Sequence, residues 1–246
     1  ISVLHAPGER PMSRPAMSSP ATRPSHPPKT LGSSLPPEAK REEPDPRRYQ
    51  QLAPAAPDGP IDLSQLWDDG GAADLELEVG FGRGMFLLER AAAAPGSRIL
   101  GLEIKRKWAY LVAERANKLG VRNVRVFGAD ARDVLARLTP DRALARMFMH
   151  FPDPWWKKRH AKRRLNGPGM FDPAARLLRP AGELFIQTDV EDRAAGFLED
   201  LREHGGFDIP PEGYVRENPF HARSNREKRA IADGLPIYRI LVTRRA

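Results

Sequence analysis

Cysteine is absent from this 246-residue chain. Without it the protein has no disulfide framework, no thiolate nucleophile and no cysteine-ligated zinc or iron–sulfur centre. The six histidines are scattered along the sequence, so no metal-ligand spacing stands out and we expect no metal site. No apolar run approaches the roughly 20 residues that cross a bilayer, and we therefore expect no membrane segment.

Acidic residues are fewer than basic ones. The chain has 32 Asp and Glu against 40 Lys and Arg, which gives a formal net charge of +8. Long-range attraction then favours polyanionic partners, but charge alone does not choose among nucleic acid, anionic lipid and acidic protein. Nothing in the sequence calls for an obligate protein partner, and we expect a monomer or a homodimer.

Large apolar residues are sparse in the first sixty residues, where 14 of the 25 prolines fall. Ordering such a segment would cost about 1 to 2 kcal/mol of backbone entropy per residue with little burial in return. We therefore predict a disordered, proline-rich extension over residues 1–60 and one domain over residues 61–246. The prolines and acidic residues argue against a mitochondrial presequence, and no apolar signal-peptide core follows Ile1, so we expect a cytoplasmic protein.

From residue 61 onward, short apolar runs alternate with alanine- and leucine-rich helical stretches. This alternation predicts a doubly wound, mostly parallel α/β sheet of Rossmann-like type. The expected strands are Leu75–Val79, Arg98–Leu102, Val124–Phe127, Arg146–His150 and Glu183–Gln187, with an antiparallel C-terminal strand over Pro236–Thr243. The expected helices are Met85–Ala94, Lys107–Leu119, Ala131–Leu138, Gly169–Leu178 and Val190–His204. We expect no helix in the polar segment before the final strand.

A glycine-rich turn follows the first expected strand, with Gly80, Phe81, Gly82 and Gly84 leading into a helix. Glycines there permit a tight turn and a close approach of a ligand. The spacing is one residue short of the dinucleotide fingerprint, and the carboxylate of Glu78 beside it would repel a pyrophosphate, so a nicotinamide cofactor fits poorly. The acid instead suits a ligand with cationic groups, as S-adenosylmethionine has in its ammonium and sulfonium.

Carboxylates also follow the next two strands. Glu103 ends the second strand, where an acid can accept hydrogen bonds from both ribose hydroxyls. Asp130 ends the third strand, where it can meet the adenine amino group, although capping the next helix would also explain it. Because parallel strands end at one edge of the sheet, these acids predict a cofactor site there.

The fourth strand runs into a proline-bracketed aspartate, Asp153, and then into a basic run. Two prolines restrict the backbone around Asp153 and present its carboxylate rigidly. The run over residues 157–164 holds six positive charges, one histidine and no acid. Phosphates would collect there, although a solvated basic face is the alternative.

At this point the sequence resembles the bacterial tRNA (guanine-N7)-methyltransferases. The resemblance covers most of residues 72–246. It rests on Glu78–Gly84, Gly101–Lys105, Phe151–Trp155 with its Lys-Lys-Arg-His run, Gln187–Asp189, and the tail Ser224–Arg239. It implies an S-adenosylmethionine-dependent enzyme that methylates N7 of a guanosine in the variable loop of tRNA.

The resemblance also assigns residues. It implies that S-adenosylmethionine is held by Glu78, Gly80, Phe81, Gly82, Gly84, Glu103, Asp130 and Asp153. It implies that Asp153 is the catalytic residue, and that the substrate is bound by Lys157, Asp189, Ser224 and Glu227. We expect tRNA phosphates to meet Lys158, Arg159, Lys162, Arg163 and Arg164.

Two questions stay open at this level. The family tail carries Thr-x-x-Glu where this chain has Ser224–Glu227, so residues 218–221 are another possible register. Asp189 could equally cap the helix that follows it. The alternative functions are methylation of another RNA base or of a protein amide, and a non-catalytic RNA-binding α/β module.

Overall fold

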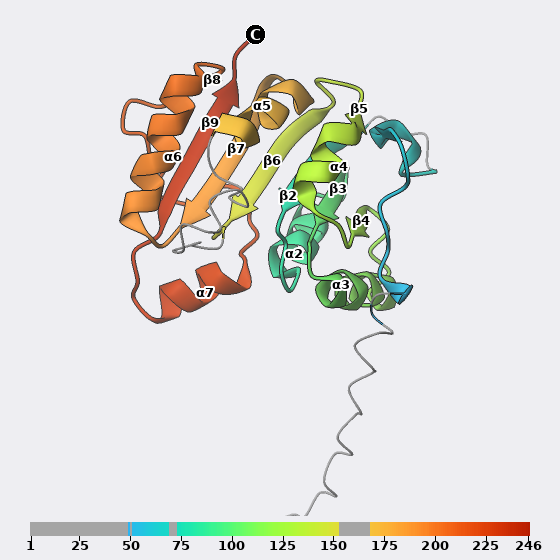
Figure 1. The fold of residues 1–246 in the computed structure, drawn as a ribbon. Coiled ribbons are helices and arrows are strands. Elements are labelled where there is room, and N and C mark those ends of the chain that lie inside the picture. Colours follow the sequence, from blue (N-terminus) through green and yellow to red (C-terminus); the bar gives the residue numbers. More distant parts are fainter. Residues whose placement is uncertain (1–48, 50, 69–72, 153–167) are drawn as a thin grey trace, which may run out of the picture. The chain divides into compact units, whose positions relative to one another are not determined.

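The computed structural model describes Tyr49 and residues 51–68, 73–152 and 168–246. A seven-stranded sheet with the order β4-β3-β2-β6-β7-β9-β8 forms its centre (Figure 1). Its strands are β2 (Asp74–Val79), β3 (Ser97–Leu102), β4 (Val124–Phe127), β6 (Leu144–His150), β7 (Leu178–Thr188), β8 (Phe207–Asp208) and β9 (Tyr238–Arg244). The five strands from β4 to β7 are parallel, and β9 is antiparallel to β7 and β8. The predicted sheet and its antiparallel C-terminal strand are confirmed.

Helices cover both faces of this sheet. They are α2 (Met85–Ala93), α3 (Arg106–Lys118), α4 (Ala131–Arg137), α5 (Pro168–Leu177), α6 (Glu191–His204) and α7 (Asn225–Ala232). Alternate strand residues point to opposite faces, so Leu100 packs in the cluster with α4, α5 and α6, whereas Ile99 packs with α2 and α3. All five predicted helices are present within about a residue of the expected bounds.

The order of the strands reverses beside β2. The chain winds outward from β2 through β3 to β4 and then returns to place β6 on the other side of β2. Doubly wound sheets bind ligands outside the carboxyl ends of the strands at such a switch point. The carboxyl ends of β2, β3, β6 and β7 are therefore the place to look for a site.

The polar segment before β9 differs from the expectation. It contains α7, which begins after Ser224, whose hydroxyl accepts a hydrogen bond from the backbone N–H of Glu227 at 3.1 Å. Ser-x-x-Glu before a helix is the capping-box pattern, so a local signal for this helix exists in the sequence. We expected no helix there because the segment has little apolar residue content, and its few buried positions become visible only in the fold.

Packing also begins earlier than residue 60. Tyr49 and Ala53 are buried, and the carbonyl oxygen of Pro54 accepts a hydrogen bond from the N–H of Gly128 at 2.8 Å. A short two-stranded parallel sheet, β1 (Ile61–Asp62) with β5 (Leu138–Thr139), and the 3-10 helix η1 (Leu63–Gln65) follow. The expected boundary at residue 60 therefore falls within a segment that packs on the domain, since Tyr49 and Ala53 find partners far along the chain. No helix among the described residues is long and apolar enough to cross a membrane.

Candidate active site

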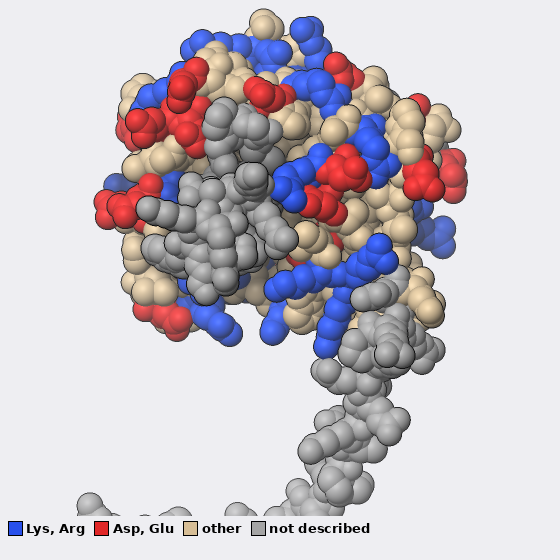
Figure 2. Space-filling model, in the orientation of Figure 1, with Lys and Arg blue, Asp and Glu red and all other residues tan. Residues whose placement is uncertain are grey.

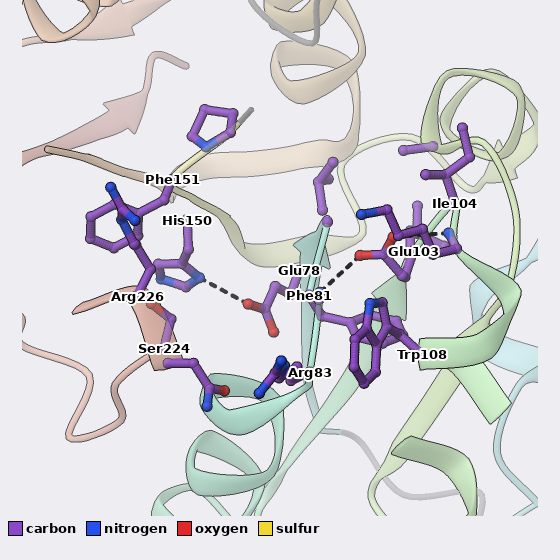
Figure 3. Close-up of a pocket in the computed structure, with 18 of the residues that line it drawn as sticks. Glu78, Phe81, Arg83, Glu103, Ile104, Trp108, His150, Phe151, Ser224 and Arg226 are labelled. Atoms are coloured by element: carbon purple, nitrogen blue, oxygen red, sulfur yellow. Dashed lines mark hydrogen bonds and ion pairs between the residues drawn. The ribbon is translucent and has the colours of Figure 1, made fainter. Parts of the chain in front are cut away.

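A cavity of about 940 Å³ opens at the carboxyl ends of β2, β3, β6 and β7 (Figure 3). Most of the predicted site residues that the structure describes line it. They are Glu78, Gly80, Phe81, Gly82, Glu103, Asp130, Asp189 and Ser224. The remaining lining includes side chains that sequence reasoning did not single out, among them Arg83, Lys105, Trp108, His150, Arg193 and Arg226.

The glycine-rich turn forms one wall of the cavity. Gly82 has a φ of +54°, which residues with a Cβ rarely adopt, and a Cβ added there would meet no atom within 4 Å. The open space above Gly82 is room for a ligand. Gly84 differs, because a Cβ there would lie 2.6 Å from Cγ2 of Val112 on α3. Close packing of the turn on α3 explains Gly84, and it is not among the cavity-lining residues.

Glu103 holds this turn in place through hydrogen bonds to the backbone. The buried carboxylate accepts hydrogen bonds from two backbone N–H groups, with Oε2 2.8 Å from the nitrogen of Gly82 and Oε1 2.9 Å from that of Lys105. Each carboxylate oxygen can accept a second hydrogen bond. Glu103 is therefore held rigidly beside the glycine turn with acceptor capacity left for a diol.

Glu78 lies deeper and is less completely bonded. It is 1% exposed, and its Oε1 lies 2.9 Å from Nδ1 of His150 at the end of β6. Its Oε2 is also buried and has no hydrogen-bond partner among the described residues. Figure 3 places this carboxylate between His150 and the glycine-rich turn. A buried carboxylate oxygen without a donor is costly, so the site is chemically incomplete until a donor or cation arrives.

Asp130 contacts both the backbone and the side chain of Arg132. It caps α4 by accepting a hydrogen bond from the N–H of Arg132 at 3.0 Å, and it pairs with the Arg132 guanidinium at 2.6 Å. That hydrogen bond and the charge of Asp130 raise the pKa of Arg132. The capping explanation for Asp130 is thus realised, while its position in the cavity lining leaves the adenine contact as a prediction.

Asp189 does not cap the helix that follows it. The cap position of α6 is Val190, whose N–H is 3.2 Å from the hydroxyl of Thr188. The carboxylate of Asp189 instead accepts two hydrogen bonds from Arg226 at the start of α7, one of them from Nε at 2.9 Å. Asp189, Ser224 and Arg226 therefore meet at the cavity from two segments far apart in the sequence.

Glu227 lies elsewhere. It is fully buried, with Oε2 3.0 Å from Nδ2 of Asn218 and Oε1 3.2 Å from Nη2 of Arg239. It is not among the cavity-lining residues. The two candidate registers of the tail motif thus meet in one network, since Asn218 belongs to the alternative segment. This network supports the start of α7 from inside the protein.

The catalytic candidate and the basic run fall outside the described residues. These positions are Asp153, Lys157, Lys158, Arg159, Lys162, Arg163 and Arg164. The last described residue before them, Pro152, lines the cavity, and its carbonyl oxygen accepts a hydrogen bond from Arg193 at 3.1 Å.

Charge is divided between the floor and the rim of the cavity. The acids Glu78 and Glu103 are buried in its floor, whereas the cations Arg83 and Lys105 are exposed. The half-buried acids Asp130 and Asp189 also line the cavity, where they pair with Arg132 and Arg226. A cationic group suits the floor and an anionic group suits the rim. Within the described residues, no group of three or more His, Asp or Glu side chains could hold a metal ion.

These features fit S-adenosylmethionine. The unpartnered Oε2 of Glu78 matches an ammonium, the fixed carboxylate of Glu103 matches a ribose diol, and the space over Gly82 admits a ligand close to the backbone. Both carboxylates are acceptors, as an ammonium and a diol require. His150, which completes the Glu78 site, could have been suspected from its place as the one polar residue in the apolar run Met147–Phe151.

Comparisons with known proteins agree. The family model described as "Putative methyltransferase" matches residues 72–240. A tRNA (guanine-N(7)-)-methyltransferase of Myxococcus xanthus is 38% identical over 177 residues, covering 70% of this chain and 85% of the relative. A protein of the same name from Thermosynechococcus vestitus is 32% identical, covering 78% of this chain and 88% of the relative.

Among solved structures, the 16S rRNA methyltransferase KamB matches with a TM-score of 0.52 at 16% sequence identity, covering 81% of this chain and 94% of that one. At this identity the likeness concerns the fold alone. Together with the family model and the curated relatives, the cavity leads to one assignment: the chain belongs to the S-adenosylmethionine-dependent methyltransferase family that includes the tRNA (guanine-N7)-methyltransferases.

Proposed function

We propose that this enzyme transfers a methyl group from S-adenosylmethionine to N7 of a guanosine in the variable loop of tRNA and forms 7-methylguanosine. The observation that carries the proposal is the match of 70% and 78% of the chain to two curated relatives of that name. The division of charge supports it, because the cofactor is cationic and tRNA is a polyanion.

The cofactor supplies an electrophilic methyl group on a sulfonium. In this proposal Glu103 accepts hydrogen bonds from the ribose hydroxyls, and Oε2 of Glu78 accepts one from the ammonium of the methionyl end. Gly82 leaves the backbone open to the ligand. Asp130 faces the adenine end while it caps α4. The chain thus places acceptors for the hydroxyls and for the cationic end in one cavity.

Guanine N7 carries a lone pair and no proton, so the nucleophile needs no general base. The protein has two tasks, which are to orient the base and to stabilise the positive charge that develops on it. We assign both to Asp153 and Asp189, as acceptors for the N1 and N2 hydrogens of guanine. Arg226 holds Asp189 in place at the cavity. Orientation of this kind is worth up to about 7 to 11 kcal/mol in favourable cases.

RNA backbone contacts are assigned to Lys and Arg side chains. The basic run over residues 157–164 would take phosphates, and Lys158, Arg159, Lys162, Arg163 and Arg164 are its candidates. Further Lys and Arg side chains gather over α3 on the face that Figure 2 presents, where that helix carries Arg106, Lys107, Arg115 and Lys118. Contacts of this type read the shape and charge of a folded RNA, while the target base must be exposed to reach the cavity.

The test is methylation of unmodified tRNA by the purified protein with a labelled methyl donor, followed by nucleoside analysis. Label in 7-methylguanosine supports the proposal. Label in another nucleoside would instead favour the alternative of a different RNA base. Calorimetry with S-adenosylhomocysteine separates the enzyme from a non-catalytic RNA-binding module, because such a module has no reason to bind this product.

A further inference from the structure

Glu78 and His150 form a buried, hydrogen-bonded pair at the cavity. Both side chains are almost fully enclosed, at 1% exposed for Glu78 and 2% for His150, and only 2.9 Å separates Oε1 of Glu78 from Nδ1 of His150. An ionised carboxylate has no hydrogen to give, so Nδ1 of the imidazole is the donor. His150 therefore fixes one oxygen of Glu78 and leaves Oε2 without a partner among the described residues.

The surroundings of His150 are those of an aromatic core. Its ring centroid lies 4.0 Å from that of Phe86, 6.0 Å from that of Phe148 and 6.0 Å from that of Phe185. A phenylalanine would fill this position without a polar atom. The imidazole instead buries Nε2 with no partner in the part of the chain that the structure describes. A buried unsatisfied polar atom costs about 1 to 3 kcal/mol, so packing alone would favour phenylalanine here.

The neighbouring strand repeats this pattern. Gln187 on β7 is the register partner of His150 on β6 and is fully buried. Both atoms of its side-chain amide also lack partners among the described residues. Polar side chains in register on parallel strands share one face of the sheet. An unsatisfied polar row at the strand tips, directly beside a ligand cavity, is typical of a binding site and atypical of a structural core.

We propose that His150 is a positioning residue for the cofactor. Its Nδ1–H holds Oε1 of Glu78, a residue that lines the cavity, and so leaves Oε2 to receive the ammonium of the methionyl end. Without this hydrogen bond the carboxylate must be ordered by the ligand itself, and the cofactor binds more weakly. The inference rests on the proposed function for the identity of the cofactor, and it concerns binding alone.

Two variants separate this role from simple packing. His150→Phe keeps the ring and the contacts with Phe86 but removes the donor. His150→Asn removes the ring but keeps an N–H donor at the same number of bonds from Cβ as Nδ1. A packing role predicts that the phenylalanine variant is normal and the asparagine variant impaired. A positioning role predicts the reverse.

The measurement is the dissociation constant of S-adenosylhomocysteine, with 5′-methylthioadenosine as the matched ligand that has no ammonium. We expect His150→Phe to weaken S-adenosylhomocysteine about ten- to a hundredfold, as for a lost hydrogen bond to a charged group. Its affinity for 5′-methylthioadenosine should stay within about threefold, because that ligand does not reach Oε2. His150→Asn should keep its affinity for S-adenosylhomocysteine within about threefold. The melting temperature of His150→Phe should not exceed that of the wild type, because both buried oxygens of Glu78 then lack a donor, so the affinities are measured at a temperature where the variant is folded.

Several outcomes would overturn the inference. One is an unchanged affinity of His150→Phe for S-adenosylhomocysteine, and another is an equal loss for both ligands. If His150→Phe does not fold, the asparagine variant decides, since a loss of about tenfold or more there also overturns it. Failure of the wild type to bind S-adenosylhomocysteine would instead refute the proposed function, so the two failures are distinguishable.

Discussion

Gly84 and Val112 form the contact that sets the glycine-rich turn against α3. Gly84 has a φ of +70°, and an added Cβ would lie 2.6 Å and 2.7 Å from the two γ-carbons of Val112. Gly82, two residues earlier, also has a positive φ of +54°, but an added Cβ there meets nothing within 4 Å. The substitution Gly84→Ala therefore adds strain and a clash, whereas Gly82→Ala adds strain alone.

The magnitudes follow from these distances. A residue with a Cβ at positive φ loses about 1 to 2 kcal/mol, partly offset by about 0.4 to 1 kcal/mol because alanine restricts the unfolded chain. We therefore expect Gly82→Ala to lower the free energy of unfolding by about 1 kcal/mol. Overpacking against Val112 adds about 1 to 3 kcal/mol for Gly84→Ala, which gives a total of about 2 to 4 kcal/mol.

The assay is equilibrium unfolding in urea of the wild type, the two glycine variants, Val112→Ala, and the double variant of Gly84 and Val112. Val112→Ala removes both γ-carbons, and the nearest remaining atom, Cβ of Val112, would lie 3.3 Å from the new methyl. The cost of Gly84→Ala should then fall to about that of Gly82→Ala, a coupling of about 1 to 3 kcal/mol. Equal costs for the two glycine variants, or a cost of Gly84→Ala that Val112→Ala leaves unchanged, would refute the packing explanation.

Three further predictions concern the cofactor, the charge of α6 and the RNA. Glu103→Gln leaves one oxygen for two backbone N–H donors, so the free energy of unfolding should fall by about 1 to 3 kcal/mol. Calorimetry should also find weaker binding of S-adenosylhomocysteine. Unchanged values in both measurements would contradict the assignment. Burial, and then neighbouring glutamates on α6, raise the pKa of Asp200, so its ionised form destabilises the fold above that pKa. Asp200→Asn should therefore raise the free energy of unfolding at neutral pH by up to about 0.5 kcal/mol. This gain should vanish below about pH 3, where the aspartate is protonated in both the folded and the unfolded protein. A gain that persists in acid would exclude this cause. Replacing Arg163 and Arg164 with alanine should weaken tRNA binding and leave cofactor affinity unchanged. The slope of log binding constant against log salt concentration should become shallower by about 0.7 to 0.9 for each phosphate that is no longer neutralised. Equal slopes for the variant and the wild type would rule out phosphate binding by these arginines.

Local patterns in the sequence were enough to predict the sheet and most of the described residues that line one wall of the cavity. Apolar runs alternating with helical stretches predicted the parallel strands, and the glycines and acids that follow those strands predicted the edge of the sheet at which the cavity lies. These signals act within a few residues, because strand periodicity and the φ of glycine are local properties. Glu78 and Glu103 line the cavity for that reason. Helix α7 in the tail was not predicted, since the polar composition of the segment outweighed the capping pattern at Ser224.

Only the tertiary structure decided which side chains meet. Glu78 and His150 are 72 residues apart, and their pairing depends on the return of β6 to the side of β2, which no local pattern specifies. Asp189 meets Arg226, and Glu227 turns inward to Arg239, because α7 and β9 pack where they do. The sequence alone determined which of these residues are acids. Which partners they contact depends on the order and register of the strands, since contacts between distant residues form only once the whole sheet is assembled.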